Sequence, residues 1–250
     1  MKKVLVLFMA VFLTVGMADS ARAVTFNLFD WGFNADGEEI SSPNLNAPGD
    51  LGAALNATYT TGGFSFTTGL GTVGVKVTGV GAHSVVSWFD HEIDESVNTY
   101  FNETGSTSGI TAAGQTWEID EPGWVDGDIY EHLQDTVAAG SFLDDGIGIS
   151  THGNTTFPDD VSMALGWDFI LGAGESANIS FVLSDTVVPS GFYLAHNDPD
   201  SLATIYFSST LEIGSDNPVV PEPSTVILLG IGMAGLVATR KRLGKRFIKG

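Results

Sequence analysis

The stretch Val161-Ser162-Met163-Ala164-Leu165-Gly166-Trp167-Asp168-Phe169-Ile170-Leu171 is the most regular part of the sequence. Apolar side chains stand at every second position and alternate with mostly small or polar ones, a pattern typical of a half-buried β-strand. The Gly-rich stretch 172–176 predicts a turn, and residues 177–184 repeat the alternation. We therefore expect the two strands to form a hairpin, with a third strand within residues 202–213.

Shorter β patterns precede this region. We expect strands at 24–29, 63–68, 72–80, 84–91 and 115–120, most of them separated by turns that contain Gly, Asn or Asp. Residues 129–139 carry the best helical pattern, and residues 34–57 are expected to form a long surface excursion. Many short strands, 31 Gly and little helical patterning predict an all-β fold, an antiparallel β-sandwich or jelly-roll-like domain.

Charge is distributed very unevenly along the 250 residues. Thirty Asp and Glu oppose ten Lys and Arg, but residues 24–219 hold 28 of the acids and a single basic residue, Lys76, so their net charge is −27. Nucleic-acid binding is excluded for such a body, because it requires clustered Lys and Arg. The absence of Cys excludes disulfides, thiol catalysis and Cys-ligated metals.

The first 23 residues have the three parts of a secretory signal peptide. Lys2 and Lys3 provide the positive start, an apolar run covers residues 4–17, and Ala21-Arg22-Ala23 supplies the small residues that signal peptidase recognises. We expect cleavage after Ala23, with Ala21 and Ala23 as the recognised side chains, and therefore export of the remaining chain.

The C-terminal region has a second tripartite pattern. Val220-Pro221-Glu222-Pro223-Ser224-Thr225 precedes an uncharged run at 226–239, and the tail 240–250 begins with Arg240, Lys241 and Arg242. The run is shorter than the about 20 residues of an ordinary membrane span, although snorkelling basic side chains compensate in part. The positive tail would remain on the cytoplasmic side, leaving the acidic body outside.

These C-terminal residues resemble the PEP-CTERM sorting signal of exported Gram-negative proteins. The resemblance implies recognition of Pro221, Glu222 and Pro223, with Ser224 beside them, by an exosortase, which is a membrane-embedded processing protease. It further implies transient anchoring in the inner membrane and a mature protein at the cell surface, associated with exopolysaccharide. A permanent anchor that is never cut remains the alternative. The expected organisation is a signal peptide at 1–23, an acidic β-rich extracytoplasmic domain at 24–217 and a sorting signal at 218–250.

Acidic clusters make metal binding the first candidate chemistry of the body. The selected candidates are Asp90, Glu92, Asp94, Asp126 and Asp128, and their oxygen ligands favour Ca²⁺. None of the clusters matches the twelve-residue helical calcium loop. Bound Ca²⁺ would relieve the repulsion of a body with charge −27, but a solvated acidic face is the competing interpretation.

Evidence for catalysis is poor. The sequence has no Gly-x-Ser-x-Gly and no His-Glu-x-x-His, and paired carboxylates suited to glycoside hydrolysis cannot be chosen among so many acids. Trp124, in a Gly- and Asp-containing loop, is the candidate for stacking on a sugar ring, whereas Trp88 and Trp167 are expected in the core. We therefore expect a structural or adhesive protein and no enzyme, with a secreted carbohydrate-binding or carbohydrate-active module as the alternative.

Overall fold

The computed structural model describes residues 23–42, 57–95, 100–123, 126–148, 159–187 and 190–215. Residues 1–22, Trp124 and the whole sorting signal lie outside these ranges, so the expectations placed on them concern residues that the structure does not describe. Within the described ranges, no helix is long and apolar enough to span a membrane.

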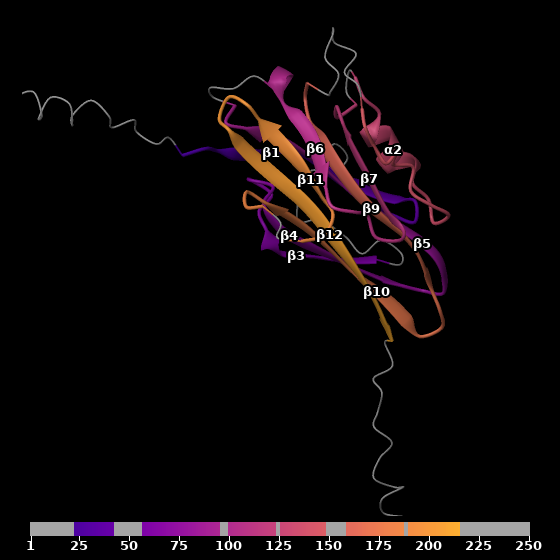
Figure 1. The fold of residues 1–250 in the computed structure, drawn as a ribbon. Helices are drawn as coiled ribbons and strands as arrows, with labels where there is room; N and C mark the ends of the chain where they lie inside the picture. Colours follow the sequence, from indigo (N-terminus) through magenta and orange to yellow (C-terminus); the bar gives the residue numbers. More distant parts are fainter. Residues whose placement is uncertain are drawn as a thin grey trace, which may run out of the picture.

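Two six-stranded sheets form the domain (Figure 1). The first has the strand order β2 (Glu38–Ser41), β1 (Phe26–Ala35), β5 (Gly81–Ile93), β9 (Ser162–Leu171), β7 (Gln115–Asp120) and β8 (Gly146–Ile147). The second has the order β3 (Ala57–Phe64), β4 (Gly71–Thr78), β10 (Glu175–Ser184), β12 (Ala203–Ser215), β11 (Tyr193–Asp198) and β6 (Thr104–Ser108). All pairings are antiparallel except that of β7 with β8, which confirms the all-β prediction.

The predicted hairpin of the two most regular strands is wrong. β9 pairs with β5 and β7 in the first sheet, whereas β10 pairs with β4 and β12 in the second. The chain thus crosses from one sheet to the other between Leu171 and Glu175. Alternation identifies the apolar face of a strand but not its hydrogen-bonding partner, because facing sheets both turn apolar residues inward. The third predicted strand is present as β12 and does pair with β10.

One apolar core joins the two sheets. Phe33 and Phe89 from the first sheet contact Phe181 and Phe207 from the second, with ring centroids 5.3–6.4 Å apart. Trp88 and Trp167 are buried, as the sequence predicts. The predicted surface excursion is corrected in part, since residues 38–41 form β2 at the edge of the first sheet.

A short helix covers the outer face of the first sheet. It is α2 (Ile129–Asp135), and it ends earlier than the predicted 129–139 because Thr136 has an extended backbone (φ −57°, ψ 129°). Ile129 and Leu133 pack with Trp88 and Ala164 in a small second core. β9 is consequently buried on both faces over much of its length rather than half-buried. Figure 1 shows α2 beside β7.

Candidate metal sites

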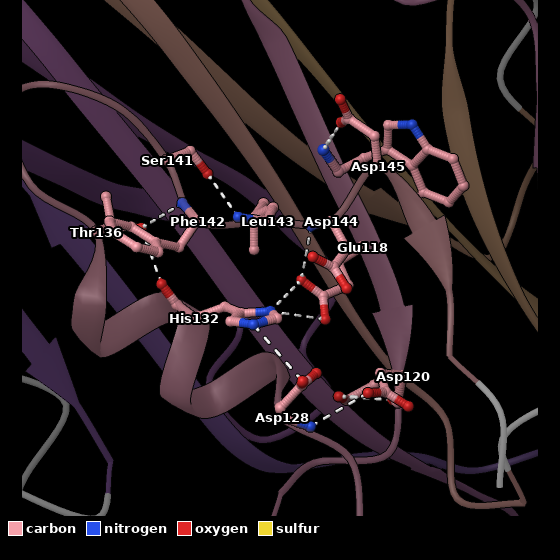
Figure 2. Close-up of polar contacts among 12 residues, drawn as sticks. Glu118, Asp120, Asp128, His132, Thr136, Ser141, Phe142, Leu143, Asp144 and Asp145 are labelled. Atoms are coloured by element: carbon pink, nitrogen blue, oxygen red, sulfur yellow. Dashed lines mark hydrogen bonds and ion pairs between the residues drawn. The ribbon is translucent and has the colours of Figure 1, made fainter.

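A histidine and three carboxylates meet where α2 lies on β7. Glu118, Asp128, His132 and Asp144 each offer a ligand atom, and these atoms all lie within 4.8 Å of one another. Among the described residues, no other group of three or more His, Asp or Glu ligands is this compact. Figure 2 shows the convergence from the strand, the helix and the segment before β8. We call these four residues the His132 cluster.

Local structure explains the position of each member of the His132 cluster. Ile119 is in the main core, so the alternation of β7 turns Glu118 to the opposite face, under the helix. Asp128 and His132 are four residues apart and therefore lie on the same side of α2. Asp144 approaches from the loop that leads into β8, and its backbone N–H donates to Glu118 Oε2 at 3.2 Å.

The His132 cluster is already internally satisfied. His132 Nδ1 lies 2.9 and 3.1 Å from the two carboxylate oxygens of Glu118, and its Nε2 lies 3.6 Å from Asp128 Oδ2. Burial raises the pKa of Glu118 to about 7. Burial opposes protonation of His132, but the hydrogen bond and charge of Glu118 outweigh it and raise the pKa of the imidazole. One nitrogen and three oxygens are a ligand set for Zn²⁺ or Mn²⁺ rather than Ca²⁺.

A second acidic site is a pocket at the end of the first sheet where β5 and β7 finish and β9 begins. The register aligns Asp90 with Ser162 and Ser162 with Asp120, so the residues that follow β5 and β7 lie near those that precede β9. The pocket has a volume of about 500 Å³ and is lined by six carboxylates, three aromatic rings and a proline: Glu92, Glu95, Glu121, Asp126, Asp159, Asp160, Phe29, Tyr100, Phe101 and Pro122. We call it the acidic pocket.

Further carboxylates are buried beside the acidic pocket. Asp90 and Glu103 are each 1% exposed, and neither Asp90 Oδ1 nor Glu103 Oε1 has a hydrogen-bond partner among the described residues. Burial, followed by the charges of Asp160 and Glu92, raises the pKa of Asp90 well above its usual range. Burial also raises the pKa of Glu103 to about 9 and that of Asp160 to about 7. A carboxylate site of this kind favours any ligand that brings positive charge.

Histidines beside the pocket supply little of that charge. His196 Nε2 lies 2.6 Å from Glu103 Oε2, but burial lowers the pKa of His196 to about 4. Burial likewise lowers the pKa of His91 to about 3. Lys76, the one Lys or Arg among the described residues, lies on β4 in the second sheet. The buried acids therefore lack a matching set of cationic side chains within the described part of the chain.

The five predicted metal ligands do not form one site. Glu92 and Asp126 line the acidic pocket, and Asp90 lies beside it. Asp94 instead accepts a hydrogen bond from Thr25 Oγ1 at 3.3 Å, near the start of β1. Asp128 belongs to the His132 cluster. Alternating and helical patterns do not reveal which loops meet, so the sequence alone could not assign these candidates to separate sites.

Several site residues, among them Glu118, Asp144, Glu103 and His132, were not selected from the sequence. Glu103 is an isolated acid before β6, and nothing in its neighbourhood indicates burial. His132 had a usable signal, because it follows Asp128 by four residues at the start of a predicted helix. Trp124, the candidate for stacking on sugar, lies outside the described residues.

Comparison with protein families identifies the C-terminal signal. The model of the PEP-CTERM protein-sorting motif matches residues 219–242, a range that contains Pro221-Glu222-Pro223 and the basic residues 240–242. No curated protein and no solved structure shows significant similarity to the chain. The motif marks the chain as an exosortase substrate, and hence as an exported protein that is anchored transiently in the membrane and then localised to the surface.

Proposed function

We propose that this protein is a non-enzymatic structural or adhesive component of an exopolysaccharide matrix outside a Gram-negative cell. The observation that carries the proposal is the PEP-CTERM motif at residues 219–242, because this signal directs a protein to the surface. The stable two-sheet body would then be the part delivered to the matrix.

The termini have separate tasks in this proposal. Signal peptidase removes residues 1–23 after export. Residues 226–239 hold the precursor in the inner membrane, and Arg240, Lys241 and Arg242 keep the tail on the cytoplasmic side. The exosortase then recognises Pro221-Glu222-Pro223, with Ser224 adjacent, and releases the body. Proline restricts its own φ and favours an extended conformation of the residue before it, which would suit entry of this segment into a protease cleft.

Replacing Pro221, Glu222 and Pro223 with alanine tests the sorting step. In a Gram-negative host that contains an exosortase, the variant is expected to accumulate as a membrane-bound precursor, while the wild type is released. Immunoblots of membrane, surface and medium fractions measure the ratio. Alanine replacement of Asp216 and Asn217 is the matched control, because it also removes an acid but lies before the expected sorting signal and before the matched range.

Two results would contradict the sorting step. Unchanged release of the Pro-Glu-Pro variant would show that the motif is not the processing signal, and a wild type that stays in the membrane would favour a permanent anchor.

For the matrix role, the released wild type is expected to sediment with exopolysaccharide purified from the producing strain. Recovery entirely in the supernatant would contradict that role.

One observation favours a second function, that of a secreted carbohydrate-binding or carbohydrate-active module. Phe29, Tyr100 and Phe101 are exposed and line the acidic pocket, with the rings of Tyr100 and Phe101 3.9 Å apart. Exposed aromatic faces beside carboxylates suit a sugar ring and its hydroxyl groups. A glycan array, probed with the wild type and Phe101→Ala, tests this function. Specific binding lost in the variant would support it.

A further inference from the structure

We propose that the acidic pocket is a Ca²⁺ site, with Asp90, Glu92, Glu121 and Asp160 as its central carboxylates. The inference concerns the folded body alone and is independent of sorting and of any matrix partner. The excess of acidic residues in the sequence suggests a bound cation but does not locate it. The inference gives this cation a position and a set of ligands.

Chain topology gathers the carboxylates without local sequence proximity. Glu92 lies near the end of β5, Glu121 directly follows β7, and Asp160 lies two residues before β9. Antiparallel pairing of β9 with both other strands brings these three ends to one edge. The backbone N–H of Asp159 donates to Glu121 Oε1 at 3.4 Å, which ties two of the segments together.

Unpartnered buried oxygens distinguish this pocket from an ordinary acidic surface. Asp90 is 99% buried, and in the described part of the chain no donor reaches its Oδ1, Asp160 Oδ1 or Glu103 Oε1. Asp90 and Glu92 are two residues apart on β5 and therefore lie on the same face of the strand, and Glu92 lines the pocket. The charges of Asp160 and Glu92 also contribute to the raised pKa of Asp90, after burial. A solvated acidic face would expose its oxygens to water, whereas buried acceptors normally have a partner. These oxygens instead require a cation or a proton.

The donor set selects the class of cation. All four central ligands are carboxylates, and hard oxygen ligands favour Ca²⁺ or Mg²⁺ over transition metals. Ca²⁺ accepts six to eight oxygens in irregular geometry, with water among them, whereas Mg²⁺ demands a near-ideal octahedron. A pocket of about 500 Å³ has room for coordinating water, and its ligands come from three separate segments of the chain: β5, the residue after β7 and the residues before β9. Both features favour Ca²⁺.

The expected result is saturable Ca²⁺ binding by the full chain. The protein is purified in mild detergent, stripped with EDTA and titrated with CaCl₂ by calorimetry, and its melting temperature is measured in EDTA and in Ca²⁺. Ca²⁺ is expected to raise the melting temperature by several degrees, because a ligand that binds only the folded state stabilises it. NaCl of matched ionic strength is expected to give a smaller rise, since it only screens charge.

Asp160→Asn is the decisive variant, because it keeps the side-chain shape and removes one ligand charge. Its affinity for Ca²⁺ is expected to fall at least tenfold. In EDTA it is expected to melt above the wild type, since less repulsion remains. Asp185→Asn is the matched control, because Asp185 is exposed in the turn after β10 and away from the pocket lining. It should bind Ca²⁺ like the wild type.

Glu92→Gln provides a second test if Asp160→Asn does not fold, because Glu92 is only partly buried. It too is expected to weaken Ca²⁺ binding. The inference is overturned by an absence of saturable heat, by equal stabilisation from Ca²⁺ and matched NaCl, or by pocket variants that bind Ca²⁺ as tightly as Asp185→Asn. None of these results depends on where the protein is sorted, so they leave the proposed function untouched.

Discussion

His132 and Glu118 illustrate how single residues determine the chemistry of this protein. Glu118 is 2% exposed, and within the described ranges His132 is the one cationic side chain that contacts it. Nearby, Asp120 accepts hydrogen bonds from the backbone N–H groups of Glu121 at 2.8 Å and Asp128 at 3.1 Å (Figure 2). Burial raises the pKa of Asp120 to about 6 despite these bonds. The two buried carboxylates, Glu118 and Asp120, are thus stabilised by one imidazole and by two backbone N–H groups, respectively.

Removing the imidazole should destabilise the fold. His132→Gln is expected to lower the free energy of unfolding by about 2 kcal/mol, because Glu118 stays buried without its cationic partner. Urea denaturation at pH 6.5 measures the change. Glu131→Gln, at the exposed neighbouring position of α2, is the control and should remain within about 0.5 kcal/mol of the wild type. An equal effect of both substitutions would show that the ion pair contributes no stability.

At the scale of the element, β9 joins the two halves of the first sheet. It pairs with β5 along one edge and β7 along the other, and its inner face includes Met163 and Leu165. Its outer face carries small residues where α2 lies above it. A Cβ on Gly166 would lie only 2.5 Å from Thr116 Oγ1, so this position of the strand requires glycine. The sequence of β9 therefore provides large apolar side chains for the main core on one face and small residues beneath α2 on the other.

Two substitutions within β9 compare a core position with an exposed one. Leu165 is fully buried, and Leu165→Ala is expected to cost about 3 kcal/mol of unfolding free energy by opening a cavity. Ile170 is 74% exposed, and Ile170→Ala is expected to cost less than about 0.5 kcal/mol. Thermal or urea melts of the two variants provide the comparison. Similar losses would contradict the assignment of the inner face.

At the scale of the whole molecule, folding concentrates part of the excess of Asp and Glu at one end of the first sheet. The described residues contain Lys76 as their only Lys or Arg, and burial places several carboxyl groups together at one end of the first sheet. Folding therefore brings like charges together, which costs free energy unless protons or cations are bound. The stability of the protein should consequently decrease as the pH rises above neutrality.

Stability in EDTA is expected to fall as the pH rises from 7 to 9. Glu103 has a pKa of about 9 in the folded protein and of about 4.3 in the unfolded chain. Its stabilising contribution to the free energy of unfolding is therefore complete below pH 4 and is lost as the pH rises through 9. Glu92 and Asp160, both raised by burial to about 7, add to this loss. One proton taken up on folding corresponds to about 1.4 kcal/mol per pH unit.

The buried histidines act in the opposite sense but at lower pH. His91 and His196 have pKa values of about 3 and 4 in the folded protein, against about 6.5 in the unfolded chain. Their stabilising contribution to the free energy of unfolding is therefore complete above about pH 6.5 and is lost as the pH falls. Urea midpoints at pH 7, 8 and 9 therefore isolate the carboxyl groups. Glu103→Gln should flatten the dependence. A wild-type midpoint that is constant or rises over this range would contradict the assignment.

Several elements could be predicted from sequence with little error. The strand expected at 115–120 has those bounds as β7, and the strand expected at 84–91 lies within β5. Four strands, β2, β6, β8 and β11, were not predicted. β8 has only two residues, and β6 reads Thr-Gly-Ser-Thr-Ser without an apolar alternation. β2, β6 and β8 are short edge strands, which gain their structure from a neighbour while their own residues carry little signal.

The sequence by itself determined the class of the fold, the acidic character of the body and the sorting signal, because each of these is encoded in contiguous residues. Alternation over β9 specifies a strand, and residues 219–242 specify the signal without help from the rest of the chain. Tertiary structure alone decided that β9 and β10 belong to different sheets and that Asp90, Glu121 and Asp160 lie together. Backbone hydrogen bonds are chemically alike in every strand, so only the packing of the whole core selects the partners, and the partners in turn position the acids.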